Sequence, residues 1–537
     1  MTIKRVILIG LTILAIAKVI LSLVASWNEP QIQSRLELYQ TNLFLSTTEW
    51  QWDNTDNSVD LTAARDAIIG NEPFKKAQKQ YQQVRESAQT TESQIIAKLQ
   101  ELSPKQVATS TSVEKPSTLV KPITDTPTSP QQQQLKKSLV KVEKLIDELD
   151  LRLGILQVQQ GETKAAIETW TNLGKLAHTQ EFVPVFHTSS VQTAKTLIAL
   201  WHEPPRLLPN AERQIEQNLD SWFRDCALTQ LYQSQERQEH LASLQAKKQQ
   251  RAEQAILKLA LISAIPGVGG LLGVGLMIFL LVQRLLQGKQ SILATNSEVP
   301  WETPWDWEVI WQVLIFGFFF VGQILLPLLL PLSISLLGLN PVNFTVQMKA
   351  FYSLFAYILL AAGGLSVLYF FVKPFLPISE DWFRFKFRSN WVFWGLGGYL
   401  VALPSVVVVS LINQQLWQGK GGSNPILPLV LEGHDTIAIL IFGLTACVAA
   451  PLFEEMIFRG FLLPSLTRYL PVWGAVLISS LLFAIAHLSL SEVLPLATLG
   501  IVLGVVYTRS RNLLAPMLLH SLWNSGTLLS LFILGSQ

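Results

Sequence analysis

Cysteine and charge are both scarce in this chain of 537 residues. The two cysteines, Cys226 and Cys447, lie in unlike regions, one polar and one apolar, which argues against a disulfide framework and against a thiolate metal site. Only 15% of the residues are charged and the formal net charge is +2, so nothing points to a nucleic-acid partner. Apolar residues are abundant instead, at 49% of the chain with 26 Phe and 16 Trp, which is typical of a membrane protein.

The apolar residues are concentrated in the second half of the chain. Up to about residue 254 the sequence is rich in Gln, Glu, Lys, Ser and Thr, whereas the later apolar runs reach the roughly 20 residues that a helix needs to cross a bilayer. We predict a membrane domain over residues 255–537. Its eight predicted spans are 257–283, 309–333, 351–372, 391–413, 436–468, 472–489, 493–508 and 513–533.

A further apolar run, Val6–Ala25, lies near the start of the chain behind Lys4 and Arg5. A cleavage site after Ala25 would need a small residue where Leu23 stands, so we expect residues 1–27 to be an uncleaved anchor rather than a signal peptide. The predicted fold class is all-α: a polytopic helical membrane protein with about nine transmembrane helices and an N-terminal helical extramembrane region.

Basic residues in the loops indicate how these spans cross the membrane. With the anchor counted as the first span, the loops after even-numbered spans hold Arg284, Lys289, Lys373, Arg384, Lys386, Arg388, Arg468, Arg509 and Arg511. The loops after odd-numbered spans hold only Lys349 and Lys420. Because short cytoplasmic loops are enriched in Lys and Arg, we predict that the N-terminus is cytoplasmic and that residues 28–254 lie on the other side. We expect an integral multi-pass protein of a bacterial plasma membrane or an equivalent membrane.

Residues 28–254 are predicted to be helical and extramembrane. A linker is expected at about 103–134, where Ser, Thr, Pro, Lys and Gln leave too little apolar surface to form a core. Residues 150–176 resemble one tetratricopeptide-type helical hairpin, with Gly154 and Ala166 allowing close packing and Gly161 at the turn. An ordinary helical hairpin is an equal alternative, because a single such repeat lacks neighbours. From residue 210 to 254 one long charged helix is predicted to lead into the membrane.

Ionisable residues within the predicted spans are the candidates for chemistry, because such groups are costly in hydrocarbon and mark functional sites by default. Glu454 and Glu455 follow an apolar run, and Arg459 lies one helical turn beyond Glu455. His487 ends the next run, and the last span holds the remaining two candidates, four residues apart on one face. These are His520 and Asn524.

A helical hairpin would bring two of these positions together. Glu455 and His487 lie 15 and 17 residues from Leu470, near the turn expected at residues 469–471. At about 1.5 Å per residue, both lie roughly 22–26 Å from that turn and therefore at similar depth.

The residue types point to the activation of water. A glutamate beside histidines can take a proton from water and later give it to a leaving amine. If Arg459 holds Glu455 ionised, Glu454 is the better candidate for the base. His520 and Asn524 are placed to stabilise a developing oxyanion. A catalytic zinc bound by Glu454, His487 and His520 is equally compatible with these residues, and metal-free water activation remains open.

Each of these features alone has a simpler explanation. The Glu455–Arg459 pair is also a common helix-stabilising pair, and His487 alone is more often a buried histidine. His520 and Asn524 alone are equally expected to join helices by hydrogen bonds. Their occurrence together favours one polar site.

The pattern Glu454-Glu455-x-x-x-Arg459, Phe483-x-x-x-His487 and His520-x-x-x-Asn524 resembles the three motifs of the CPBP family, in order. That family comprises the prenyl-protein (CAAX) proteases of the Rce1 type and the bacterial abortive-infection relatives. The resemblance covers about residues 300–537 and implies an intramembrane endopeptidase, usually classed as a metalloprotease. It implies that Glu454 and His487 activate water, that Arg459 is the family's arginine, and that His520 and Asn524 support the oxyanion.

The predicted function is therefore an intramembrane endopeptidase acting on a membrane-associated protein or peptide within the lipid bilayer. The alternative is a non-catalytic membrane adaptor that binds a protein partner through residues 28–254. A transporter fits less well, because the sequence shows no clear inverted repeat or paired broken helices.

Overall fold

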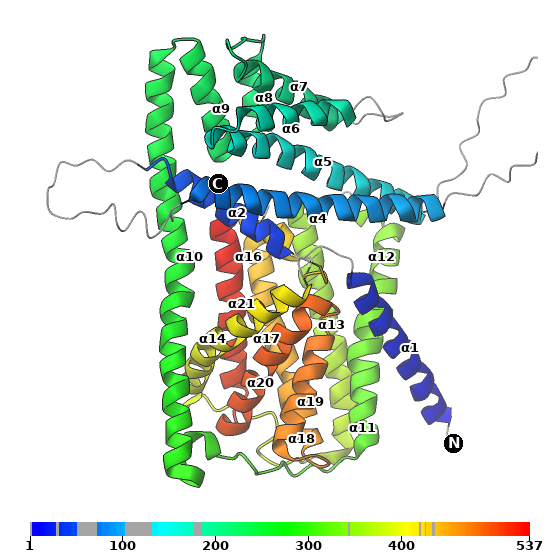
Figure 1. The fold of residues 1–537 in the computed structure, drawn as a ribbon. Coiled ribbons are helices and arrows are strands. Elements are labelled where there is room, and N and C mark those ends of the chain that lie inside the picture. Colours follow the sequence, from blue (N-terminus) through cyan, green and yellow to red (C-terminus); the bar gives the residue numbers. More distant parts are fainter. Residues whose placement is uncertain are drawn as a thin grey trace, which may run out of the picture. The chain divides into compact units, whose positions relative to one another are not determined.

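The protein is helical throughout the part of the chain that the computed structural model describes, and no strand occurs there (Figure 1). The described residues are 3–27, 32–50, 72–102, 130–176, 185–341, 344–417, 420–424, 426–431 and 435–536. The chain divides into two compact units, one of residues 1–36 with 260–537 and the other of residues 37–259. The all-α fold class predicted from the sequence is confirmed.

The unit of residues 37–259 has its own apolar core, with Tyr81, Trp170, Trp222 and Phe223 at most 2% exposed. Its helices are α2 (Ile32–Thr47), α4 (Pro73–Glu101), α5 (Pro130–Gln159), α6 (Thr163–Leu176), α7 (Val185–Leu200), α8 (Ala211–Asn218), α9 (Ser221–Ser234) and the first part of α10 (Gln238–Gln287). Of the predicted linker at 103–134, residues 103–129 lie outside the described residues, and α5 begins at Pro130.

The predicted hairpin is formed by α5 and α6. Gly161 has φ +81° in the connecting turn, a conformation that glycine adopts without strain. A Cβ on Gly154 would lie 2.2 Å from the Trp170 ring, so only glycine allows this approach. The Trp170 indole N–H donates to the carbonyl of Leu151 at 3.1 Å and fixes the contact.

The prediction of one helix from residue 210 to 254 is wrong. Three helices, α8, α9 and the start of α10, occupy this stretch. Leu219 has an extended backbone, with φ −119° and ψ 147°, which ends α8. Its side chain is only 3% exposed, so burial of this side chain favours the break in the helix. Ser221 and Glu236 have positive φ, which also interrupts the helix at these points.

The unit of residues 1–36 and 260–537 contains most of the predicted membrane spans. Within the described residues eight helices are long and apolar enough to cross a membrane, and they are Ile3–Ser26, Gln238–Gln290, Trp307–Leu336, Val346–Phe375, Trp391–Trp417, Thr436–Leu466, Leu490–Ser510 and Leu514–Gly535. The predicted span at 472–489 is instead a helix of 14 residues, about 21 Å long at about 1.5 Å per residue, which is shorter than the roughly 30 Å hydrocarbon layer. It ends early because the chain turns at Leu488, which has φ +58°.

The helices of this unit run in chain order. They are α1 (Ile3–Ser26), the rest of α10 with η1 (Gly288–Gln290) and η2 (Ile292–Ala294), α11 (Trp307–Gln312), η3 (Val313–Leu325), α12 (Leu326–Leu336), α13 (Val346–Val372), η5 (Lys373–Phe375), α14 (Trp391–Trp417), α15 (Ile426–Leu431), α16 (Thr436–Leu444), η6 (Thr445–Ala449), α17 (Ala450–Glu455), η7 (Met456–Leu462), α18 (Leu463–Leu466), α19 (Val472–Ile485), η8 (Leu490–Glu492), α20 (Val493–Ser510) and α21 (Leu514–Gly535).

The run α16–α18 is one continuous helical stretch that contains two π-helical segments, η6 and η7, on either side of the two glutamates. It turns at residues 467–471 and returns as α19, so the hairpin expected at residues 469–471 is confirmed. Helix α20 packs on α19 and α14, while α21 packs on α14, η6 and α17 (Figure 1).

Pro451 explains how α21 is attached to this run. A proline has no backbone N–H, so it cannot donate to the carbonyls of Ala446 and Cys447 that lie one turn before it. Both carbonyls accept hydrogen bonds from α21 instead, Ala446 from Asn524 Nδ2 and Cys447 from Ser521 Oγ, each at 2.6 Å.

Candidate active site

The two adjacent glutamates differ in their surroundings. Glu454 is 15% exposed, and its Oε1 accepts a hydrogen bond of 2.8 Å from the hydroxyl of Tyr357 on α13. Its second oxygen, Oε2, is buried and has no hydrogen-bonding partner among the described residues. Glu455 is fully buried, and its Oε1 accepts from Arg459 Nη1 at 2.9 Å. Oε2 of Glu455 also has no hydrogen-bonding partner among the described residues, so the two glutamates differ in exposure and in the ion pair, which only Glu455 makes with Arg459.

Arg459 lies at the centre of the helices that surround the site. It is fully buried, its Nη2 donates to the carbonyl of Gly500 on α20 at 3.1 Å, and its guanidinium lies 4.4 Å from the centre of the Phe483 ring on α19. A Cβ on Gly500 would lie 2.9 Å from Cβ of Ser480, so the absence of a side chain allows α20 to approach α19. Arg459 therefore connects α20 and α19 to the run that carries the glutamates.

His520 on α21 contacts both glutamates. Its Nδ1 lies 2.8 Å from Oε1 of Glu455, and because a carboxylate only accepts, Nδ1 carries the proton and donates. Its Nε2 lies 3.9 Å from Oε2 of Glu454, the oxygen without a partner. A histidine whose Nδ1–H is held by a buried carboxylate has a fixed ring orientation. Nε2 of His520 therefore faces Glu454.

His487 lies at the end of α19 and is oriented by the backbone. Its Nδ1 donates to the carbonyl of Phe483 at 2.9 Å, so in the neutral ring Nε2 carries the lone pair. The rings of His487 and His520 both contact Phe483 edge-on, at centroid distances of 5.0 and 5.8 Å. In the described part of the chain no hydrogen bond joins His487 to Glu454 or Glu455.

Asn524 lies one turn after His520 and is bound through its Nδ2 to the carbonyl of Ala446. This contact joins α21 to η6, the interhelical role that the sequence offers as the simpler explanation of this residue. The structure thus brings Glu454, Glu455, Arg459 and His520 into direct contact, and it places His487 and Asn524 beside them.

The zinc suggested by the sequence does not fit the side chains as they stand. Within the described ranges no three His, Cys, Asp or Glu side chains are grouped as a metal ion requires. His520 faces Glu454 through Nε2, and the hydrogen bond from Nδ1 of His487 to the Phe483 carbonyl leaves the Nε2 lone pair of His487 available to a ligand, so the hydrogen bonds of the two histidines do not themselves exclude a metal. A metal therefore stays a prediction, and no catalytic step below depends on one.

Sequence reasoning did not single out Tyr357 or Ser521. Tyr357 is one of three tyrosines within residues 346–375, and no motif or spacing distinguishes it from the others. The only signal in the sequence was that Tyr357 lies inside a long apolar run, where its hydroxyl needs a partner. Ser521 directly follows His520. Pro451 was the signal for it, because a proline leaves a carbonyl one turn earlier that needs another donor, and the Ser521 hydroxyl supplies one.

The segment that holds these residues is similar to a known family. Residues 436–526, which include all six candidate residues, match the family described as type II CAAX prenyl endopeptidase Rce1-like. The predicted family resemblance is confirmed. We call residues 436–526 the Rce1-like region.

Three curated relatives are each similar to a part of the chain. The membrane-embedded CAAX protease MroQ of Staphylococcus aureus (strain USA300) is 27% identical over 137 residues, which are 24% of this chain and 54% of the relative. YdiL of Bacillus subtilis (strain 168), named as a membrane peptidase, is 25% identical over 134 residues, which are 25% of this chain and 54% of the relative. A 24.3 kDa protein of Escherichia coli is 41% identical over 103 residues, which are 18% of this chain and 48% of the relative. The chain thus spans about half the length of these relatives, and no solved structure gives a significant match.

Proposed function

We propose that the Rce1-like region is an intramembrane endopeptidase and that Glu454 is its general base. The observation that carries the proposal is the position of Glu454: it is the partly exposed glutamate of the two, and its partnerless Oε2 lies 3.9 Å from Nε2 of His520. A buried carboxylate oxygen without a donor is suited to accept a hydrogen bond from water, and an imidazole held by a second carboxylate is suited to donate in the transition state.

The reaction follows from these positions. Glu454 takes a proton from water as the water oxygen attacks the carbonyl carbon of the substrate, and the carbonyl oxygen becomes negative. His520, held in place by Glu455, donates from Nε2 to this oxygen. The C–N bond then breaks, and the proton on Glu454 passes to the leaving amine. We assign His487 to orient the water through its Nε2 lone pair, as the family resemblance implies.

The role of Tyr357 is to position the base. Its hydroxyl donates to Oε1 of Glu454, so the other oxygen faces His520. The hydrogen bond of Arg459 to Glu455 holds that second carboxylate in position beside His520. In this proposal Glu454 activates the water, and Glu455 orients His520.

A glutamate-to-glutamine exchange tests the proposal. Glu454→Gln keeps the shape and the acceptor for Tyr357 but removes the base, so hydrolysis is expected to fall by about a thousandfold. The measurement compares the membrane proteomes of cells that carry the wild type, Glu454→Gln or the exposed loop variant Glu380→Gln at equal expression. Peptides newly cut in the wild type and in Glu380→Gln should stay intact in Glu454→Gln.

A non-catalytic adaptor would behave in the opposite way. Residues 37–259 have a core of their own, which suits a partner-binding role. An adaptor would keep its cellular effect in Glu454→Gln and lose it when residues 37–259 are removed. If Glu454→Gln and the wild type produce the same cleavage products, the peptidase proposal fails.

A further inference from the structure

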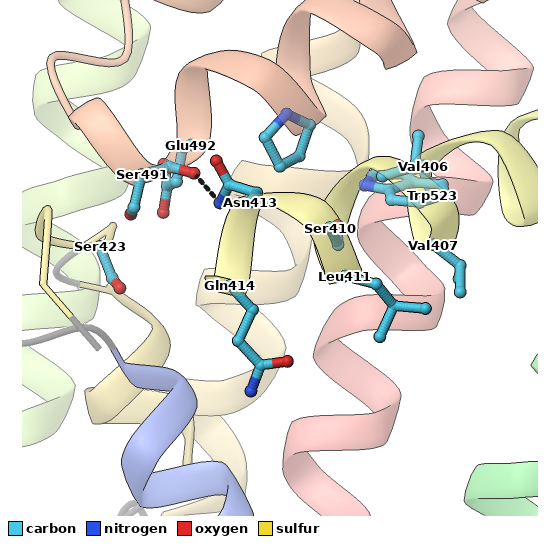
Figure 2. Close-up of a pocket in the computed structure, with 11 residues that line it drawn as sticks. Val406, Val407, Ser410, Leu411, Asn413, Gln414, Ser423, Ser491, Glu492 and Trp523 are labelled. Atoms are coloured by element: carbon cyan, nitrogen blue, oxygen red, sulfur yellow. Dashed lines mark hydrogen bonds between the residues drawn. The ribbon is translucent and has the colours of Figure 1, made fainter. Parts of the chain in front are cut away.

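A cavity of about 400 Å³ takes no part in the chemistry described above, although Glu492 in its wall interacts electrostatically with His487 (Figure 2). One face of the second half of α14 forms one wall, and the start of α20, Trp523 of α21 and Ser423 form the rest. A volume of this size falls in the range of ligand-binding pockets, roughly 300–1,000 Å³.

The two ends of the cavity differ in polarity. Figure 2 shows Asn413, Ser491 and Glu492 together at one end, with Val406 and Trp523 at the other. A ligand that matches this arrangement has an apolar stem and a polar head.

The polar end offers hydrogen-bond acceptors. Asn413 is 7% exposed, its Nδ2 donates to the carbonyl of Ser491 at 2.7 Å, and its Oδ1 is buried without a partner among the described residues. The hydroxyl of Ser491 donates to the carbonyl of Gly422 at 2.6 Å and is therefore already engaged. A buried acceptor without a donor is unfavourable, so this end of the cavity is suited to a ligand that brings N–H groups.

Glu492 gives the polar end its charge. Its Oε1 accepts from the backbone N–H of Asn424 at 2.8 Å. None of the residues that line the cavity is Lys, Arg or His, and the basic group that interacts with Glu492 is His487, which does not line the cavity. Glu492 also precedes the first residue of α20, where the helix dipole favours a negative charge. The head that suits this end is therefore cationic.

Residues at both ends of the cavity lie close in the chain to candidate site residues, and Glu492 interacts electrostatically with His487. Ser491 and Glu492 follow His487 by only four and five residues, and Trp523 directly precedes Asn524. The loop after His487 is fixed, because Gly421 accepts from Ser489 Oγ at 3.2 Å and from the Ser491 N–H at 3.1 Å. A residue of a bound peptide can thus occupy the cavity while a neighbouring peptide bond lies at the site.

We propose that this cavity binds a lysine or arginine side chain of the substrate at one fixed position near the scissile bond. The methylene stem contacts Val406 and Trp523, and the charged head donates to Glu492 and to Oδ1 of Asn413. This inference rests on the proposed endopeptidase function and names the substrate class of that site.

Cleavage of a peptide library by the full-length protein in lipid nanodiscs tests the inference. The probe is an equimolar set of synthetic apolar peptides in which each position in turn carries lysine, arginine, norleucine or glutamate, with products identified by mass spectrometry. The wild type is expected to favour lysine and arginine at one position. Glu492→Gln, which keeps the acceptor for Asn424, should reduce that preference at least tenfold while norleucine peptides are cut as before, and Glu492→Lys should favour glutamate there. A wild type without a basic preference, or one unchanged in Glu492→Lys, overturns the inference.

A binding measurement separates this inference from the proposed function. Titration calorimetry with n-butylguanidinium, and with the neutral n-butylurea as control, uses the Glu454→Gln protein, so it does not depend on hydrolysis. The guanidinium is expected to bind at least ten times more tightly than the urea, and to lose that advantage when Glu492→Gln is added. If the library is not cut at all, the endopeptidase proposal fails and the titration alone decides the cavity. Equal binding of the two probes overturns the cationic assignment.

Discussion

The buried pair of Arg459 and Glu455 allows a quantitative prediction. Both side chains are fully buried and 2.9 Å apart, and Arg459 also donates to the carbonyl of Gly500. Arg459→Met leaves Glu455 in the interior with His520 as its only partner among the described residues. Breaking one side of a buried ion pair costs about 3–5 kcal/mol, so we expect the free energy of unfolding to fall by about that amount.

A double variant shows whether the loss arises from the stranded charge. The double variant Arg459→Met/Glu455→Met has lost both members of the pair, so neither charge is left without its partner. It should be more stable than the sum of the two single losses predicts, by at least about 1.5 kcal/mol, which lies in the coupling range of contacting residues. The assay is reversible unfolding of the purified protein in mixed micelles by increasing sodium dodecyl sulfate, followed by circular dichroism. A single loss below about 1 kcal/mol, or strictly additive losses, would refute this account of the pair.

Two further predictions concern single hydrogen bonds and ionisation. Tyr357→Phe removes the donor to the proposed base and should reduce kcat about tenfold with KM unchanged, as expected for a lost hydrogen bond of about 1.5 kcal/mol to a charged group, while the exposed Tyr369→Phe should have no effect in the same peptide assay. In the other unit, burial raises the pKa of Asp147 from 3.8 to about 6 against the opposing effect of His187. Because the folded state favours the protonated acid, the contribution of Asp147 to the free energy of unfolding is complete below pH 3.8 and is lost as the pH rises through 6. The melting temperature should therefore fall between pH 3.5 and 7, and it should fall less in Asp147→Asn.

The identity of the helical segments was predictable because each depends on a local pattern. Apolar runs of sufficient length predict spans, and every predicted span coincides with a helix in the described residues. Where a boundary depended on a tertiary contact, the prediction failed: the buried Leu219 breaks the helix expected from residue 210, and the turn at Leu488 shortens α19. Such effects follow from the partners of a residue, which one sequence does not reveal.

The candidate site shows the same division. Ionisable residues in apolar runs identified both glutamates, because their cost in hydrocarbon can be read from the sequence. The ion pair that the sequence suggested for Arg459 and Glu455 is present, but the sequence could not show that His520 would bind Glu455. It also could not indicate Tyr357, because a tyrosine in an apolar run is equally consistent with an interfacial or a packed position.

Pro451 connects the irregular backbone to the chemistry. Because it lacks an N–H, the helix before the glutamates loses one internal donor, and the carbonyls of Ala446 and Cys447 accept from α21. The same helix carries His520, so these contacts also fix the position of His520 along α21 relative to Glu455. Without these two hydrogen bonds α21 would be held at this level mainly by apolar packing, which is non-directional. The π-helical segment η6 therefore helps to position the acid–base groups. Asn524 contributes by holding α21 in place: its Nδ2 donates to the carbonyl of Ala446 and not to the partnerless oxygen of Glu454.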